Sequence, residues 1–143
     1  MIGLGSDHGG YELKEKIIKY FEDKKIPFHD YGTYNGEAVD YPDIASLVCG
    51  KITGGEIEYA FLFCGTGIGI SIAANKHKGI RAAMVSDTYS SKMAKEHNNA
   101  NVICMGGRTI GFEIAREIVE AYMSGSFMGG RHQVRVDKIE FGV

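Results

Sequence analysis

The sequence predicts an α/β fold in which a five-stranded, doubly wound parallel sheet has helices on both faces and an extra helix follows at the C-terminus. Short apolar runs, which have the length of buried strands, alternate along the chain with segments whose apolar residues recur at helical spacing. Glycine-rich turns separate most of these segments. Strands that alternate with helices form crossover units, and such units produce a parallel sheet that is covered on both sides.

Each predicted strand is short, apolar and bounded by turn residues. The strands are residues 1–6, 27–32, 58–64, 80–86 and 101–107. Helices are predicted where apolar residues repeat at helical spacing, and Pro42 suits the first turn of one of them. The helices cover residues 11–25, 42–53, the end of a glycine loop through Lys76, 87–97 and 111–123, with a last helix within 130–143 after a glycine-rich joint at 125–130. We therefore expect a single Rossmann-like domain that spans residues 1–143.

The composition excludes several classes of protein. The 16 basic and 18 acidic residues nearly balance, so the chain has no bulk attraction for nucleic acid or an anionic membrane. No stretch approaches the roughly 20 apolar residues that span a bilayer, and the N-terminus lacks the pattern of a signal peptide. Three widely spaced cysteines do not suggest a disulfide framework. These features predict a cytoplasmic protein with no nucleic-acid or membrane partner.

Unusual residues follow three of the predicted strands, in segments 6–10, 64–69 and 106–108. Ligands of doubly wound sheets bind beyond the carboxyl ends of the strands, where these segments are expected to meet. Glycines and an aspartate also end strands and start helices where no ligand binds. Three such segments on one edge of one sheet nevertheless favour a binding site.

The loop "CGTGIG" does not match the known phosphate-binding loops. It lacks the Lys-Ser/Thr ending of a P-loop, and Ile70 occupies the position at which the dinucleotide fingerprint would continue with glycine. What remains is a run of backbone N–H groups at a helix N-terminus, which suits an anion and favours the thiolate form of Cys64. Cys49 and Cys104 are expected to be inert core residues.

Two further groups could take part in a site. His97 ends a predicted helix, where a cation is favoured, so capping explains it as well as function does. Arg131 and Arg135 are four residues apart and share a helical face, where they are either solvated or bind a phosphate together with Arg108. No pair of histidines or cysteines has the spacing of metal ligands, so we expect no metal.

Several motifs together resemble those of type B ribose-5-phosphate isomerases, the family that includes the galactose-6-phosphate isomerase subunits. They extend over almost the whole chain, and their combination is specific although each is weak alone. The motifs are "GSDHGG" (5–10), "DYPD" (40–43), "CGTGIGISIAANK" (64–76), "GIRAA" (79–83), "EHNNANV" (96–102), "GGRTIG" (106–111) and "GGRHQVRV" (129–136).

The resemblance implies an aldose–ketose isomerase that interconverts ribose 5-phosphate and ribulose 5-phosphate without a cofactor. It implies that Cys64 removes the C2 proton and that His97 opens the sugar ring. The cis-enediolate would be stabilised by backbone amides of the glycine loop, with assistance from Thr66. The residues implied to bind substrate are Asp7 and Asn98 for sugar hydroxyls, Gly65, Gly67, Ile68 and Gly69 for the enediolate, and His8, Arg108, Arg131 and Arg135 for the phosphate.

Two alternatives remain open from the sequence. One is the same reaction on a six-carbon sugar phosphate, such as galactose or allose 6-phosphate. The other is a sugar-phosphate sensor without activity, which would need the arginines but not both Cys64 and His97.

Helix geometry predicts that the active site is shared between two chains. His97 ends a helix of about 11 residues, which is about 16 Å long at 1.5 Å per residue and begins at the carboxyl edge of the sheet. His97 is therefore expected at the opposite edge from Cys64 of the same chain. A two-fold homodimer, or a tetramer built from such dimers, could bring the two residues together.

Overall fold

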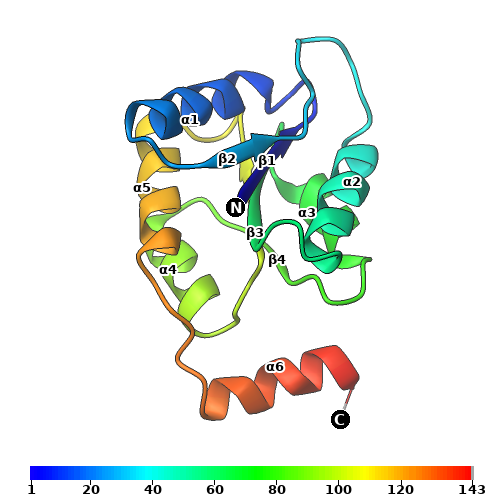
Figure 1. The fold of residues 1–143 in the computed structure, drawn as a ribbon, viewed down its shortest axis with the longest axis vertical. Helices are drawn as coiled ribbons and strands as arrows, with labels where there is room; N and C mark the ends of the chain where they lie inside the picture. The colour runs from blue at the N-terminus through cyan, green and yellow to red at the C-terminus, as the bar shows by residue number, and fades with distance from the viewer. Residues whose placement is uncertain (143) are drawn as a thin grey trace.

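A parallel sheet forms the centre of the structure, which is a computed structural model describing residues 1–142 (Figure 1). The strands of the described chain are β1 (Ile2–Ser6), β2 (Phe28–Asp30), β3 (Tyr59–Cys64), β4 (Ala82–Met84) and β5 (Val102–Gly106). They form one five-stranded sheet in the order β2-β1-β3-β5-β4, and every neighbouring pair is parallel. The chain moves outward from β1 to β2 and then crosses to the other side through β3. This confirms the predicted doubly wound fold.

The helices cover both faces of this sheet. Within residues 1–142 they are α1 (Tyr11–Asp23), α2 (Tyr41–Thr53), α3 (Ile68–Asn75), α4 (Thr88–Glu96), α5 (Phe112–Met123) and α6 (Arg131–Phe141). Helices α1, α4 and α5 pack on one face, and α2 and α3 pack on the other. Helix α6 is the predicted C-terminal helix, and it lies apart from the other helices at the end of the molecule from which β1 starts (Figure 1).

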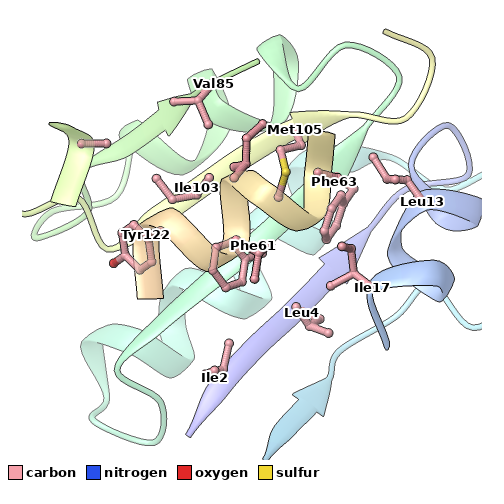
Figure 2. Packing of buried hydrophobic residues seen from close by; sticks show 14 of the residues in the cluster. Ile2, Leu4, Leu13, Ile17, Phe61, Phe63, Val85, Ile103, Met105 and Tyr122 are labelled. Carbon is pink, nitrogen blue, oxygen red and sulfur yellow. The ribbon is translucent and has the colours of Figure 1, made fainter. Parts of the chain in front are cut away.

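Strand β3 explains why the core has two halves. Its side chains point alternately to opposite faces, so Phe61 and Phe63 join the cluster under α1, α4 and α5 (Figure 2). Leu62 and Cys64 join the cluster under α2 and α3. Because both faces are covered, the strand is apolar throughout instead of alternating with polar residues.

The edge strands β2 and β4 are shorter than predicted, since residues 27–32 and 80–86 were expected to be extended. An edge strand has a neighbour on one side only, so fewer of its residues are held in the ladder. The free side of β4 is closed by Asn75, whose side chain donates to the carbonyl of Ala82 at 2.9 Å and accepts from its N–H at 2.8 Å. The remaining predicted strands and the first five helices agree with the structure to within about two residues, which is the usual uncertainty of such boundaries.

Lys14 connects α1 to the loop between β2 and α2. Its side chain is completely buried. The Nζ atom donates to Asp30 Oδ1 at 2.6 Å and to the carbonyl of Thr33 at 2.7 Å. The same Asp30 oxygen accepts from the Gly32 N–H at 2.9 Å. A buried cation that is paired in this way fixes the start of the loop, because removing an acceptor would leave the buried ammonium without its partner.

Replacing Lys14 with Met should lower the free energy of unfolding by about 3 kcal/mol, because Asp30 and the Thr33 carbonyl lose their buried partner. Urea denaturation followed by circular dichroism measures this loss. Lys16→Met, on the exposed side of the same helix, is the matched control and should change stability by less than about 0.5 kcal/mol. Equal stability of the two variants would contradict the structural role of Lys14.

Gly67 starts α3 with φ of +79°, in the left-handed region. A Cβ atom added there would also lie 2.9 Å from the Met105 carbonyl carbon. Gly67→Ala should therefore lower the free energy of unfolding by about 1–3 kcal/mol, the usual cost of a strained backbone conformation. Gly36→Ala is the control, because a Cβ atom at Gly36 meets no atom within 4 Å. A similar loss in both variants, measured by the same denaturation experiment, would argue against this explanation.

Candidate active site

The ends of β1, β3 and β5 enclose a cavity of about 390 Å³, which we call the carboxyl-edge cavity. Its lining comes from the segments that follow these three strands and from the start of α2. The lining residues are Asp7, Tyr41, Cys64, Gly65, Thr66, Ile68, Gly69 and Arg108. The predicted meeting of three strand exits at one edge of the sheet is therefore observed.

Cys64 is the last residue of β3 and lies at the bottom of this cavity. Its Sγ atom accepts a hydrogen bond from the Gly67 N–H at 3.1 Å, at the N-terminus of α3. The sulfur therefore faces a backbone donor at the start of a helix, a place where anions also bind. Cys49 and Cys104 are fully buried within the core. Burial raises the pKa of the Cys49 thiol to about 11 and that of the Cys104 thiol well above its usual value.

Backbone N–H groups of the glycine loop donate hydrogen bonds to side chains of the same segment. The Thr66 Oγ1 atom accepts from the Ile68 N–H at 3.2 Å, and the Thr66 side chain is exposed toward solvent. The amides of Gly67 and Ile68 therefore already hold the thiol and the hydroxyl of the loop. An anion bound at this loop would lie beside the Cys64 thiol and the Thr66 hydroxyl, and both groups can exchange protons.

Asp7 and Arg108 place opposite charges at the rim of the cavity. The Asp7 carboxylate is buried, and its Oδ1 atom accepts from the N–H groups of Gly9 at 2.8 Å and Gly10 at 3.1 Å. Arg108 is exposed, and its Nη1 atom would lie 3.2 Å from a Cβ atom added to Gly65. The carboxylate is therefore fixed by its own turn, while the guanidinium can adjust to a ligand.

His8 lies next to the carboxyl-edge cavity, in a smaller polar hollow of about 310 Å³ that Arg108 also lines. The ring is exposed, and its Nδ1 atom accepts from the Val39 N–H at 3.3 Å. Because Arg108 borders both hollows, it could contact one ligand together with His8 and Cys64.

Four predicted site residues lie away from the carboxyl-edge cavity, namely His97, Asn98, Arg131 and Arg135. Asp87 caps the start of α4 by accepting from the Ser90 N–H at 2.7 Å, and the helix ends at His97. Arg131 and Arg135 project from α6 into solvent, and the described lining of the carboxyl-edge cavity includes neither them nor His97. We call the group formed by His97, Asn98, Arg131, His132 and Arg135 the opposite-edge cluster.

The opposite-edge cluster is held together by α6 and the turn after α4. The His97 ring stacks on the ring of His132, with centroids 4.1 Å apart and planes inclined by 9°. Asn98 is exposed and lines a hollow of about 590 Å³ that α6 borders through Ile139 and Glu140. Figure 1 places α6 at the end of the sheet where β1 begins, whereas the cavity lies where the strands end.

Tyr41 and His132 were not predicted as site residues. Tyr41 is the first residue of α2, and its ring occupies the space into which a Cβ atom of Gly69 would project, at 2.6 Å. Both residues fall inside motifs that carried the resemblance. Their signal was missed because a tyrosine at a helix start and a histidine between two arginines are ordinary in themselves.

Within residues 1–142, no group of three or more histidine, cysteine or acidic side chains is arranged to hold a metal ion. Over the same part of the chain, every helix is too short or too polar to cross a membrane.

Comparison with known proteins agrees with this architecture. The Ribose/Galactose Isomerase family model matches residues 2–139. Ribose-5-phosphate isomerase B of Escherichia coli is 44% identical over 138 residues, which cover 96% of this chain and 93% of the relative. D-erythrulose-4-phosphate isomerase of Pectobacterium atrosepticum is 42% identical, over 98% of this chain and 93% of its own. The solved structure of ribose-5-phosphate isomerase B from Clostridium thermocellum has a TM-score of 0.95 and 45% identity, covering 97% and 94% of the two chains. The chain therefore belongs to the Ribose/Galactose Isomerase family and is an aldose–ketose isomerase.

Proposed function

We propose that this protein interconverts ribose 5-phosphate and ribulose 5-phosphate through a cis-enediolate, with Cys64 as the base. The observation that carries the proposal is the Cys64 sulfur at the bottom of the carboxyl-edge cavity, where the Gly67 N–H donates to it at 3.1 Å. Relatives that are 44% and 40% identical to this chain are named ribose-5-phosphate isomerase B.

The isomerisation requires a base that removes the C2 proton of the open-chain aldose and returns a proton to C1. Cys64 supplies this base in its thiolate form. The charge that develops on the enediolate oxygens falls at the N-terminus of α3, where it is stabilised by the helix dipole and by loop amides other than those of Gly67 and Ile68, which donate to Cys64 and Thr66. The exposed hydroxyl of Thr66 lies on the same loop and can assist proton exchange with these oxygens.

The substrate's other groups match the remaining residues of the cavity. The buried Asp7 carboxylate can accept hydrogen bonds from sugar hydroxyls, because its own turn occupies only one of its oxygens. His8 and Arg108 line one polar hollow beside the cavity and can bind the phosphate. Arginine suits this role because its forked donors match the phosphate oxygens.

The catalytic site is completed by a second copy of the chain. His97, Asn98, Arg131 and Arg135 lie at the opposite edge of the sheet, so they serve the Cys64 cavity of a partner subunit. Exposed apolar residues support such an assembly. Ile68 and Ile72 of α3 are about half exposed beside the cavity, and Val134, Ile139 and Phe141 are exposed on α6. In a two-fold dimer, the apolar surface of α3 in each copy would pack against the apolar surface of α6 in the other copy.

In this composite site, His97 of the partner copy opens the furanose ring. The C1–O4 bond breaks, O4 gains a proton, and the C1 hydroxyl loses its proton to become the aldehyde. Arg131 and Arg135 add their charges to Arg108 around the phosphate. An enzyme of this kind needs no cofactor, because the substrate supplies both carbons that change oxidation state.

The proposed base can be tested with Cys64→Ala. The variant should lower kcat for ribose 5-phosphate by roughly 10²–10⁴-fold, the usual contribution of a positioned base. KM should change little, because the phosphate contacts remain. A coupled assay should compare ribose 5-phosphate with galactose and allose 6-phosphates. Cys49→Ala is the control, since that thiol lies in the core and away from the cavity.

Two results would count against these assignments. A Cys64→Ala variant that keeps more than roughly a third of the wild-type kcat excludes Cys64 as the base, since a base contributes at least about 10². A wild-type enzyme that turns over only a six-carbon substrate overturns the proposed substrate but leaves the role of Cys64 intact.

The shared site can be tested with mixed dimers of Cys64→Ala and His97→Ala chains. Each parent should be nearly inactive, but a mixed dimer has one site in which both residues are intact. Refolding the two parents together should recover about a quarter of the wild-type activity, because half of the dimers are mixed and each has one working site. Parents refolded separately are the control. Mixed dimers that form, as shown by two affinity tags, yet remain inactive would place both residues in one chain's site.

A further inference from the structure

We propose that His132 is a positioning residue whose ring holds the imidazole of His97 in the orientation needed for ring opening. This inference rests on the proposed function, because it assigns His132 a role in the ring-opening step of that reaction.

The contact between the two rings is close and nearly parallel. Their centroids are 4.1 Å apart and their planes are inclined by 9°. His132 lies in the first turn of α6 and is only 5% exposed. Its Nε2 atom is buried without a hydrogen-bond partner in the described chain. The ring face, and not a nitrogen atom, therefore makes the contact that holds His97.

Arg81 fixes the two segments that carry the histidines. Its Nε and Nη2 atoms donate to the carbonyl oxygens of Asn98 at 3.1 Å and Asn99 at 2.8 Å, in the turn that follows His97. Its Nη1 atom is paired with the Glu140 carboxylate near the end of α6. The Met128 N–H also donates to the Glu96 carbonyl at 3.0 Å. The histidine pair is therefore assembled within one chain before it meets a partner.

Burial and the neighbouring positive charges both favour the neutral form of His132. Its burial is the largest effect that lowers its pKa, and the positive charges of His97, Arg131 and Arg135 lower it further. The ordinary pKa of histidine is about 6.5, so an imidazole whose pKa is lowered is mostly neutral at pH 7. A neutral ring can remain stacked on His97 in either protonation state of His97, because two adjacent imidazolium cations are avoided. The stack can therefore persist while His97 transfers protons between O4 and the C1 hydroxyl.

Ring opening can be separated from proton removal at C2 by the choice of substrate. 4-Deoxyribose 5-phosphate lacks O4, so it cannot form a furanose ring and needs no opening. His132→Ala should lower kcat/KM for ribose 5-phosphate at least about tenfold, because small displacements of a catalytic group cost up to about 10². The same variant should keep its wild-type kcat/KM for the 4-deoxy compound. His132→Phe retains a flat ring and should retain activity on both substrates.

Proton NMR of the His97 ring gives a readout that does not depend on activity. In the wild type and in His132→Phe, the facing ring should shift the His97 ring protons upfield, and in His132→Ala this shift should be lost. Gln133→Ala, the exposed neighbouring residue, is the control and should change neither the spectrum nor the kinetics.

Several outcomes would overturn the inference. These are wild-type activity of His132→Ala on ribose 5-phosphate, equal losses on both substrates, or a His132→Phe variant as impaired as His132→Ala. An unchanged His97 spectrum in His132→Ala would also overturn it. Failure of the proposed function is detected separately, because the wild-type enzyme would then not isomerise ribose 5-phosphate. The NMR comparison would still report whether His132 stacks on His97.

Discussion

The segments that follow β1, β3 and β5 pack backbone against backbone at their glycines, and the cavity depends on this packing. A Cβ atom at Gly10 would lie 2.4 Å from the Phe63 carbonyl carbon, and one at Gly107 would lie 2.6 Å from the Gly9 carbonyl oxygen. Backbone hydrogen bonds connect the same segments, such as Gly107 N–H to the Cys64 carbonyl at 2.8 Å. Glycine is needed at these positions because segments of the backbone approach one another closely, and not because of the dihedral angles of the glycines.

The surroundings of the Cys64 thiol also differ from those of the other two thiols. Cys49, Cys64 and Cys104 belong to the same half of the core, and burial raises the pKa of the Cys49 and Cys104 thiols. Cys64 differs because it is the last residue of its strand, so its sulfur meets the Gly67 amide at the mouth of the sheet. Cys49 lies inside helix α2 and Cys104 lies in the middle of β5, so of the three thiols only that of Cys64 stands at the end of a strand and lines the cavity.

A parallel sheet imposes a division on the site. Strands end at one edge, and the helices that follow them end at the other. A thiol at the end of β3 and an imidazole at the end of α4 therefore lie at opposite edges of one chain. Helix α6 adds Arg131 and His132 to the His97 side, and in the proposed dimer each chain would contribute this side to the Cys64 cavity of the other.

The sequence alone determined the alternation of strands and helices, the cluster of strand exits and the opposite placement of Cys64 and His97. These follow from local periodicity and from the geometry of crossover units, which act over neighbouring residues. The family motifs identified the isomerase class, but neither they nor the periodicity gave the strand order, the place of Tyr41 against Gly69 or the stack of His97 on His132. Only the tertiary structure decided these, because each is a contact between segments far apart in the chain, and its energy depends on how helices and strands pack together and not on local residue pattern.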